Sequence, residues 1–283
     1  MIMMTLKSLK TTVISILFWV LGSHAWGPIT HLYLCSLAAE RSGNETSTTF
    51  FSGCNSPDSL KWAWPELHSL QFAAHLFQSA INNSTTDLID FALGFGCHVA
   101  NDEVGHHANG FLNPPSADHD IEFNLDSMIF HEFDTTNTIV NGRLSEDVID
   151  LIQKSASSYH KMSNNGSIAP IDRARIQSAI NRFQLSLRLE LAMVRLEPQY
   201  LYEYELRRHS FCNVSSYEEV IQNFKFSADW AVRSCLKWRS IMWTRATDGA
   251  TDGDKIRENA AAHKLNEAVD EMFSANGGTS CTH

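Results

Sequence analysis

Apolar residues recur at intervals of three and four along most of the chain, which is the spacing of an amphipathic helix. In one such segment, residues 66–81, Leu67, Leu70, Ala74 and Phe77 share a face. The same pattern predicts further helices over residues 29–40, 87–107, 117–133, 145–161, 172–208 with an interruption near Pro198, 217–245 and 254–273. No segment alternates with period two and no internal repeat occurs. We therefore expect an all-α fold, a single compact multi-helix bundle.

The stretch between the first two predicted helices differs in composition. Residues 44–65 are rich in Ser, Thr, Gly and Asn, and we expect them to form a loop. Neither a Gly-rich phosphate loop nor a Gly-x-Ser-x-Gly motif occurs in the chain, so its chemistry must come from another arrangement of side chains.

The N-terminus has the order of a secretory signal peptide. Lys7 and Lys10 precede an apolar core over residues 13–21, and Ser23 and Ala25 are the small residues that close it. The core is shorter than the ~20 apolar residues of a membrane-spanning helix, although a short N-terminal anchor is the alternative. We expect residues 1–25 to be removed, so that residues 26–283 form the mature domain. The polar C-terminal residues carry no lipid-anchor signal.

The chain is acidic, with 22 Lys and Arg against 32 Asp and Glu and a formal charge of −10. Two of the basic residues lie in the signal peptide, so the mature chain has a formal charge of −12. An acidic surface repels a polyanion, which argues against nucleic acid as the partner.

Cysteines and glycosylation motifs fit a secreted protein or the lumen of the endomembrane system. Six Cys suit an oxidising compartment, and among their possible pairings we expect Cys212 to bond Cys235. Asn-x-Ser/Thr sequons begin at Asn44, Asn82, Asn83, Asn165 and Asn213.

The third predicted helix carries the main candidate chemistry. His98, Asp102 and His106 stand at positions i, i+4 and i+8 of an otherwise apolar helix and so share one face. Two imidazoles and a carboxylate are metal ligands, and the two oxygens of Asp102 allow it to bridge two metals. The alternative is a solvated polar face. His107 points about 100° further round, which predicts a supporting or surface role for it.

The fourth predicted helix adds carboxylates and a histidine. Asp118 and Glu122 share a face, as do Glu122 and Asp126, and His119 lies one helical turn before Glu122. Such residues complete metal sites on neighbouring helices of bundles, although acidic residues also suit a solvated first turn.

Upstream, Asp58 follows a proline in the expected loop, and His68 lies near the start of a helix. Together they offer one hard oxygen and one imidazole, which suits zinc. His75 lies on an apolar stripe and is interpreted as a core histidine.

These residues resemble a known family. The segment Trp-Gly-Pro-Ile-Thr-His from Trp26 to His31, together with Asp58, His68 and the spacing of His98, Asp102 and His106, resembles the zinc-dependent phospholipase C and single-strand nuclease superfamily. Within it, residues 91–107 are most similar to the catalytic domain of glycosylphosphatidylinositol-specific phospholipase D. The motifs cover residues 26–126.

The resemblance implies three zinc ions in the helix core. The first would be bound by the free amine and carbonyl of Trp26, by His31 and by a bridging Asp102. The second would be bound by Asp58, His68, His98 and Asp102. The third would be bound by His106 and the fourth helix, where relatives have His followed four residues later by Glu or Asp. Here Glu122 provides the acid, and either Asp118 or His119 completes the site.

Clustered zinc ions lower the pKa of bound water and stabilise the charge of a phosphoryl transition state. We therefore expect a secreted phosphodiesterase that acts on phospholipid or glycosylphosphatidylinositol-type lipid, with Asp58 as the candidate general base and contact with a membrane surface.

Three alternatives remain. A single-strand nuclease is opposed by the acidic chain and by His106, which follows Asp102 by four residues rather than the six of nuclease relatives. A non-catalytic secreted zinc protein is supported by the irregular fourth helix. A di-iron bundle needs paired Glu-x-x-His motifs, and the chain has only the reversed order, from His119 to Glu122.

Overall fold

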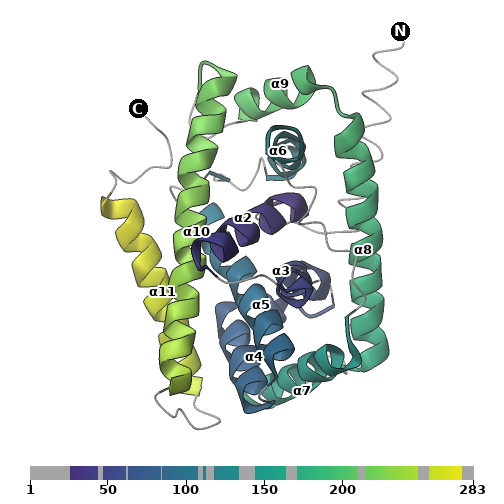
Figure 1. Ribbon diagram of the computed structural model, residues 1–283, viewed down its shortest axis with the longest axis vertical. Coiled ribbons are helices and arrows are strands. Elements are labelled where there is room, and N and C mark those ends of the chain that lie inside the picture. The colour runs from purple at the N-terminus through teal and green to yellow at the C-terminus, as the bar shows by residue number, and fades with distance from the viewer. Residues whose placement is uncertain are drawn as a thin grey trace.

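The computed structural model describes residues 26–43, 47–61, 63–83, 85–107, 111–112, 118–133, 144–163, 171–209, 214–247 and 255–275. Within these ranges the chain forms ten α-helices and one short 3-10 helix and contains no strand, which confirms the all-α prediction (Figure 1). The expected signal peptide and its cleavage point lie outside the described residues.

The helices follow one another with short connections. Their bounds are α2 Pro28–Arg41, α3 Thr48–Lys61, η1 Pro65–Leu67, α4 Leu70–Asn83, α5 Thr86–Gly105, α6 Asp118–Glu132, α7 Glu146–Ser163, α8 Arg173–Leu196, α9 Gln199–His209, α10 Tyr217–Thr247 and α11 Lys255–Ala275. The predicted break near Pro198 is confirmed, because α8 ends and α9 begins on either side of it. Ser145 caps α7, since its hydroxyl accepts a hydrogen bond from the Val148 amide at 3.3 Å.

The prediction of a loop over residues 44–65 is wrong, because most of this stretch is helix α3. Ser47 caps the helix, and its hydroxyl accepts a hydrogen bond from the amide of Phe50 at 3.2 Å. The buried side chains of Phe50, Cys54 and Leu60 attach the helix to the core. Burial of this face outweighs the weak helix propensity of its Ser, Thr, Gly and Asn residues.

Helix α5 runs through the centre of the molecule and packs most extensively against α3, α10 and α4 (Figure 1). Two glycines allow a close approach between α3 and α5. A β-carbon on Gly53 would collide with the carbonyl of Phe91, and one on Gly94 would collide with the carbonyl of Phe50. The backbones therefore meet directly, which brings Asp58 of α3 close to the middle of α5.

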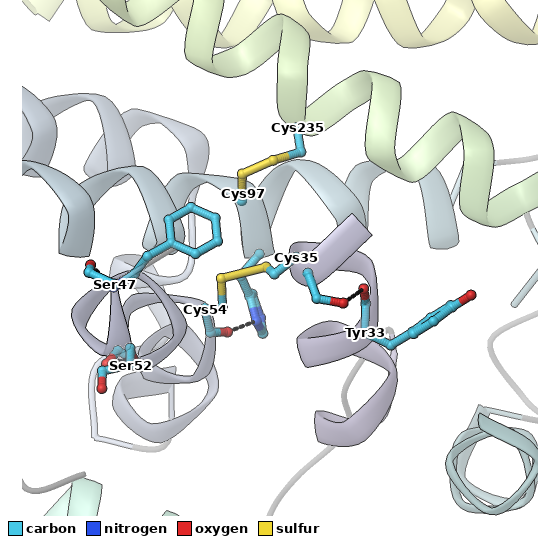
Figure 2. The surroundings of a disulfide bond; sticks show 11 residues. Tyr33, Cys35, Ser47, Ser52, Cys54, Cys97 and Cys235 are labelled. Carbon is cyan, nitrogen blue, oxygen red and sulfur yellow. Dashed lines mark hydrogen bonds between the residues drawn. A yellow bond between two sulfur atoms is a disulfide. The ribbon is translucent and has the colours of Figure 1, made fainter. Parts of the chain in front are cut away.

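Two disulfides connect these central helices (Figure 2). Cys35 of α2 is bonded to Cys54 of α3, and Cys97 of α5 is bonded to Cys235 of α10. The expected pairing of Cys212 with Cys235 is therefore wrong, because α10 packs against α5 and turns Cys235 toward Cys97. Cys212 itself lies outside the described residues. The disulfides indicate an oxidising compartment.

A single continuous apolar core joins the helices, and its largest fully buried side chains include Trp26, Trp64 and Trp238. Among the described helices, none is long and apolar enough to cross a membrane. Of the sequons, Asn82 and Asn83 are exposed at the end of α4, and the other three lie outside the described residues.

Candidate metal centre

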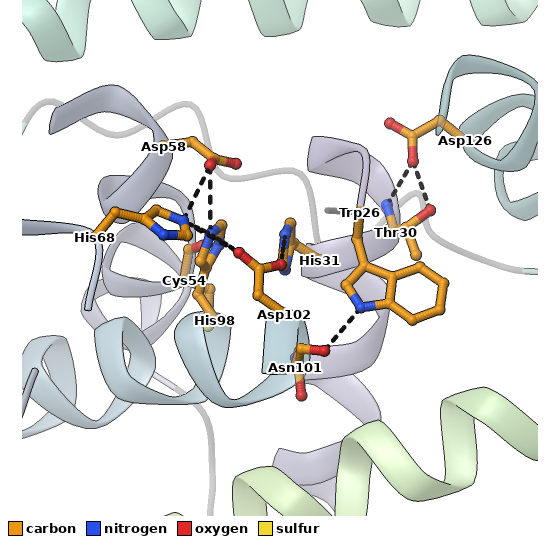
Figure 3. Close-up of polar contacts among 10 residues, drawn as sticks. All are labelled: Trp26, Thr30, His31, Cys54, Asp58, His68, His98, Asn101, Asp102 and Asp126. Atoms are coloured by element: carbon orange, nitrogen blue, oxygen red, sulfur yellow. Dashed lines mark hydrogen bonds and ion pairs between the residues drawn. The ribbon is translucent and has the colours of Figure 1, made fainter. Parts of the chain in front are cut away.

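Five buried or nearly buried side chains of the types that bind metals converge on the C-terminal half of α5. Figure 3 shows that they come from four segments: His31 from α2, Asp58 from α3, His68 from the residues between η1 and α4, and His98 and Asp102 from α5. The structure thus brings together five of the residues predicted from sequence.

Four of these residues form a compact group of donor atoms. The Nε2 atoms of His68 and His98 lie 3.2 Å apart. Asp58 Oδ1 lies 3.4 and 3.5 Å from these two nitrogens, and Asp102 Oδ2 lies 3.1 and 3.5 Å from them. The five separations lie between 3.1 and 3.5 Å, close to the about 3.3 Å expected between two ligands that each lie about 2.0 Å from a shared zinc ion.

Asp102 also belongs to a second group. Its Oδ1 atom lies 3.0 Å from Nε2 of His31, while its Oδ2 atom faces His68 and His98. The buried His31, His98 and Asp102 have donor atoms close enough to hold a metal, as do Asp58, His68 and His98. His98 belongs to both groups, and Asp102 contacts His31 through Oδ1 and His68 through Oδ2.

The ring of His98 is oriented by the backbone of α3. Its Nδ1 atom donates a hydrogen bond to the carbonyl oxygen of Cys54 at 2.6 Å, which directs Nε2 as an acceptor toward the donor group (Figure 3). Metal-binding histidines commonly have such a partner on their other nitrogen. The same Cys54 is fixed to α2 through its disulfide with Cys35.

The electrostatics of the group follow from its burial. Burial and the neighbouring His31 lower the pKa of His98 to about 4, and the His31 ring stacks on that of His98 with 3.6 Å between centroids. Burial opposes protonation of His68 as well, but hydrogen bonds to Asp102 and Asp58 raise its pKa to about 9. Burial also disfavours ionised Asp102, yet His31 and His98 hold the pKa of Asp102 well below its usual value.

A bound metal ion would satisfy the buried polar atoms of these residues better than their contacts with one another do. The Nδ1 atom of the fully buried His31 has no hydrogen-bond partner among the described residues, and its Nε2 atom lies 3.0 Å from Asp102 Oδ1. Buried polar atoms normally have a partner, and a cation supplies one to imidazole nitrogens and carboxylate oxygens alike.

Trp26 is held beside this centre by a hydrogen bond and by packing against α5. The indole of the buried Trp26 donates a hydrogen bond to the carbonyl of Asn101 on α5 at 2.9 Å (Figure 3). A β-carbon on Gly105 would collide with the same indole. Trp26 therefore packs along α5 immediately beside Asp102.

Asp126 of α6 caps the start of α2. Its carboxylate accepts hydrogen bonds from the amides of Ile29 and Thr30 at 2.9 and 2.8 Å and from the Thr30 hydroxyl at 2.6 Å. Glu190 of α8 bonds to the same carboxylate. Burial raises the pKa of Asp126 to about 6, and burial together with Asp126 raises that of Glu190 well above its usual value. The pair fixes the helix that carries His31.

The predicted third site is only partly described. His106 ends α5 and lies in a cleft rather than in either donor group, and burial lowers its pKa. Glu122 is buried on α6. The side chains of Asp118 and His119 lie outside the described residues, so the choice between them stays a prediction.

Two other histidines have partners away from the centre. His107 forms an ion pair of 2.9 Å with Asp270 and stacks on Phe273, which agrees with a supporting or surface role. His75 is half-buried and lies 2.6 Å from the hydroxyl of Ser158.

A cleft of about 390 Å³ opens onto the donor group. His68 and Asp102 form part of its wall, together with Lys61, Glu103 and residues of α11. A small molecule in this cleft would therefore reach the candidate metal ligands.

Three supporting groups have weaker signals in the amino-acid sequence. The carbonyl of Cys54 is a backbone group, so no side chain in the sequence indicates its role. Asp126 stands four residues after Glu122, and this spacing alone does not separate a helix-capping residue from a metal ligand. Glu190 is the sole acidic residue in the sequence of α8, which could have marked it.

Comparison with protein-family models, with curated proteins and with solved structures finds no match to this chain.

Proposed function

We propose that the protein is a secreted zinc-dependent phosphodiesterase that hydrolyses phospholipid or glycosylphosphatidylinositol-type lipid, as a member of the superfamily that its motifs resemble. The observation that carries this proposal is the group of closely spaced donor atoms from Asp58, His68, His98 and Asp102, with Asp102 also in contact with His31. A shared carboxylate between two nitrogen-rich groups is the arrangement that a cluster of closely spaced metals requires.

Zinc is the metal that this donor set favours. Imidazole nitrogens mixed with carboxylate oxygens suit zinc, and the donor separations of 3.1 to 3.5 Å suit ligands that share one zinc ion. Calcium and magnesium prefer six or more oxygen ligands. Zinc, when bound, acts as a Lewis acid and supplies bound water of lowered pKa.

The chain's own residues would orient the reacting groups. Asp58 lies at the edge of the donor group, where its carboxylate would accept a proton from an attacking water. Lys61 follows it on α3 and lines the cleft, where its positive charge would attract a phosphate diester. No side-chain nucleophile is needed for this reaction.

Two observations favour lipid over a single-stranded nucleic acid. The mature chain would carry a formal charge of −12, and Glu103 and Asp270 add acidic side chains to the cleft wall. The spacing of Asp102 and His106 also resembles the phospholipase branch. A non-catalytic zinc protein remains the second candidate, supported by the irregular sequence of the fourth predicted helix.

The test offers the purified mature protein phosphatidylcholine, phosphatidylinositol and single-stranded DNA. We expect turnover of lipid that is abolished in Asp102→Asn and retained in His75→Gln, a half-buried histidine outside the centre. Turnover of DNA alone would reject the lipid substrate. Absence of any turnover in protein that contains zinc would favour the non-catalytic alternative.

A further inference from the structure

Helix α8 exposes a line of leucines. Leu185, Leu189 and Leu196 are 59%, 48% and 82% exposed. With 3.6 residues per turn, the three side chains lie within about 40° of one another around the helix. The opposite side of α8 is buried against α3, α6 and α7, and Figure 1 shows α8 at the right-hand edge of the described helices. The helix is therefore apolar on two sides, and only one of them faces the core.

Arginines flank this line. Arg182, Arg188 and Arg195 are exposed, and the same helical geometry places them about 20°, 60° and 80° from the nearest of the three leucines. Helix α8 contains five Arg, and its only acidic residue, Glu190, points inward and is buried. In a chain with a formal charge of −10, this helix thus presents a basic surface. We call these three leucines and three arginines the leucine–arginine face.

Helix α9 extends the apolar exposure. Tyr200 and Tyr204, one turn apart, are both more than half exposed, and Arg207 and Arg208 are exposed near the end of the helix. Figure 1 shows that α9 follows directly from the end of α8. Tyrosine combines an apolar ring with a polar hydroxyl, which suits the boundary between water and lipid.

We propose that the leucine–arginine face binds the surface of an anionic phospholipid bilayer. The leucines would enter the boundary between headgroups and acyl chains, and the arginines would contact lipid phosphates. This inference goes beyond the proposed reaction and depends on neither the metal nor the cleft, whose walls come from other helices.

The charge and the apolar side chains of the leucine–arginine face favour an anionic bilayer over a second copy of the protein or a nucleic acid. A second copy related by two-fold symmetry would place the same arginines opposite one another, which costs energy through repulsion of like charges. A nucleic acid would satisfy the arginines but would leave the leucines without an apolar environment. An anionic bilayer satisfies both.

The experiment measures co-sedimentation of the mature full-length protein with vesicles of phosphatidylcholine alone or of phosphatidylcholine with phosphatidylserine. We expect binding to the vesicles that contain phosphatidylserine, and weaker binding as NaCl is raised. The triple variant L185S/L189S/L196S should bind about tenfold more weakly or worse, since apolar area drives insertion. The variant R182Q/R188Q/R195Q should lose a similar amount on anionic vesicles only.

Matched controls separate this face from general effects. L185F/L189F/L196F should retain binding, because the apolar character is kept. Lys264→Gln removes an exposed cation from α11 and should bind as the wild type does. The assay counts bound protein rather than cleaved lipid, so failure of the reaction and failure of docking are separate results.

Three outcomes would overturn the proposal. They are no sedimentation of the wild type with anionic vesicles, binding as strong as that of the wild type by both the serine and the glutamine variants, and dimerisation in solution that L185S/L189S/L196S abolishes without any vesicle binding. The last result would assign the face to a second copy.

Discussion

Asp102 contacts His31 through one carboxylate oxygen, at 3.0 Å from the imidazole Nε2, and this leaves its other oxygen directed at a separate group of ligands. One residue in the last turn of α5 thus joins helix α2 to the group formed with Asp58 and His68. Removing the metal, changing the N-terminus and altering the residues that hold the helices together each test this arrangement.

Chelation should destabilise the protein. Removing the metal leaves His31, His98 and Asp102 buried with unsatisfied charges and ring nitrogens, so metal binding is coupled to folding. We expect dialysis against a chelator to lower Tm by at least about 5 °C, and added zinc to restore it. Differential scanning calorimetry measures this shift, and an unchanged Tm would contradict the metal centre.

The position of the N-terminus should control activity. Trp26 is fully buried, and a side chain on Gly27 would collide with the carboxylate of Asp126. A chain that keeps one extra residue before Trp26 has no free amine at that place, so we expect it to lose the zinc shared by Trp26 and His31 and most of its activity. Zinc content and lipid turnover of Trp26-initiated and extended chains provide the comparison. Full activity of the extended chain would reduce Trp26 to a packing residue.

The Asp126–Glu190 pair should make stability depend on pH. Both carboxyls have a pKa above the ordinary value, so the native state retains protons that the unfolded state has released. Their contribution is present below about pH 4 and is lost as pH rises through about 6, by up to about 1.4 kcal/mol per pH unit for each proton.

The matched variant for this pair is Glu190→Gln, which keeps a donor to Asp126 but cannot ionise. Compared with the wild type, it should gain stability at pH 8 and show little difference at pH 4.5, measured as the free energy of unfolding in urea. The difference between the two proteins isolates the pair from other titrating groups. If the free energy of unfolding changes with pH by the same amount in both proteins, the Asp126–Glu190 pair does not cause this pH dependence.

The close packing of α3 on α5 should tolerate no added atom. Gly94→Ala directs a methyl group at the carbonyl of Phe50, so we expect a loss of about 3 kcal/mol or more and weaker zinc binding, because the helices carrying Asp58 and His98 move apart. Gly43→Ala, in open space at φ 67°, should cost only about 1 kcal/mol. Urea unfolding compares the two, and a Gly94→Ala protein as stable as the wild type would contradict this packing.

The sequence predicted most of the helices because their apolar periodicity matches the buried faces. It failed at α3, where Ser, Thr, Gly and Asn have weak helix propensity and burial against α5 decides the structure. The spacing on one helix face indicated His98 and Asp102, which lie in the candidate donor groups, and also His106, which does not. It could not give the pairing of Cys97 with Cys235 or the role of Glu190, because these depend on which helices become neighbours.

Zinc stoichiometry of the mature protein, with its N-terminus verified, tests the central claim most directly. We expect mass spectrometry of the metal to give at least two zinc ions per chain in the wild type and in Glu103→Gln, a neighbour on α5 outside both donor groups. Asp102→Asn should lose zinc from both groups together, because it removes the shared charge. One zinc ion or none per wild-type chain, or full zinc content in Asp102→Asn, would contradict a centre bridged by Asp102.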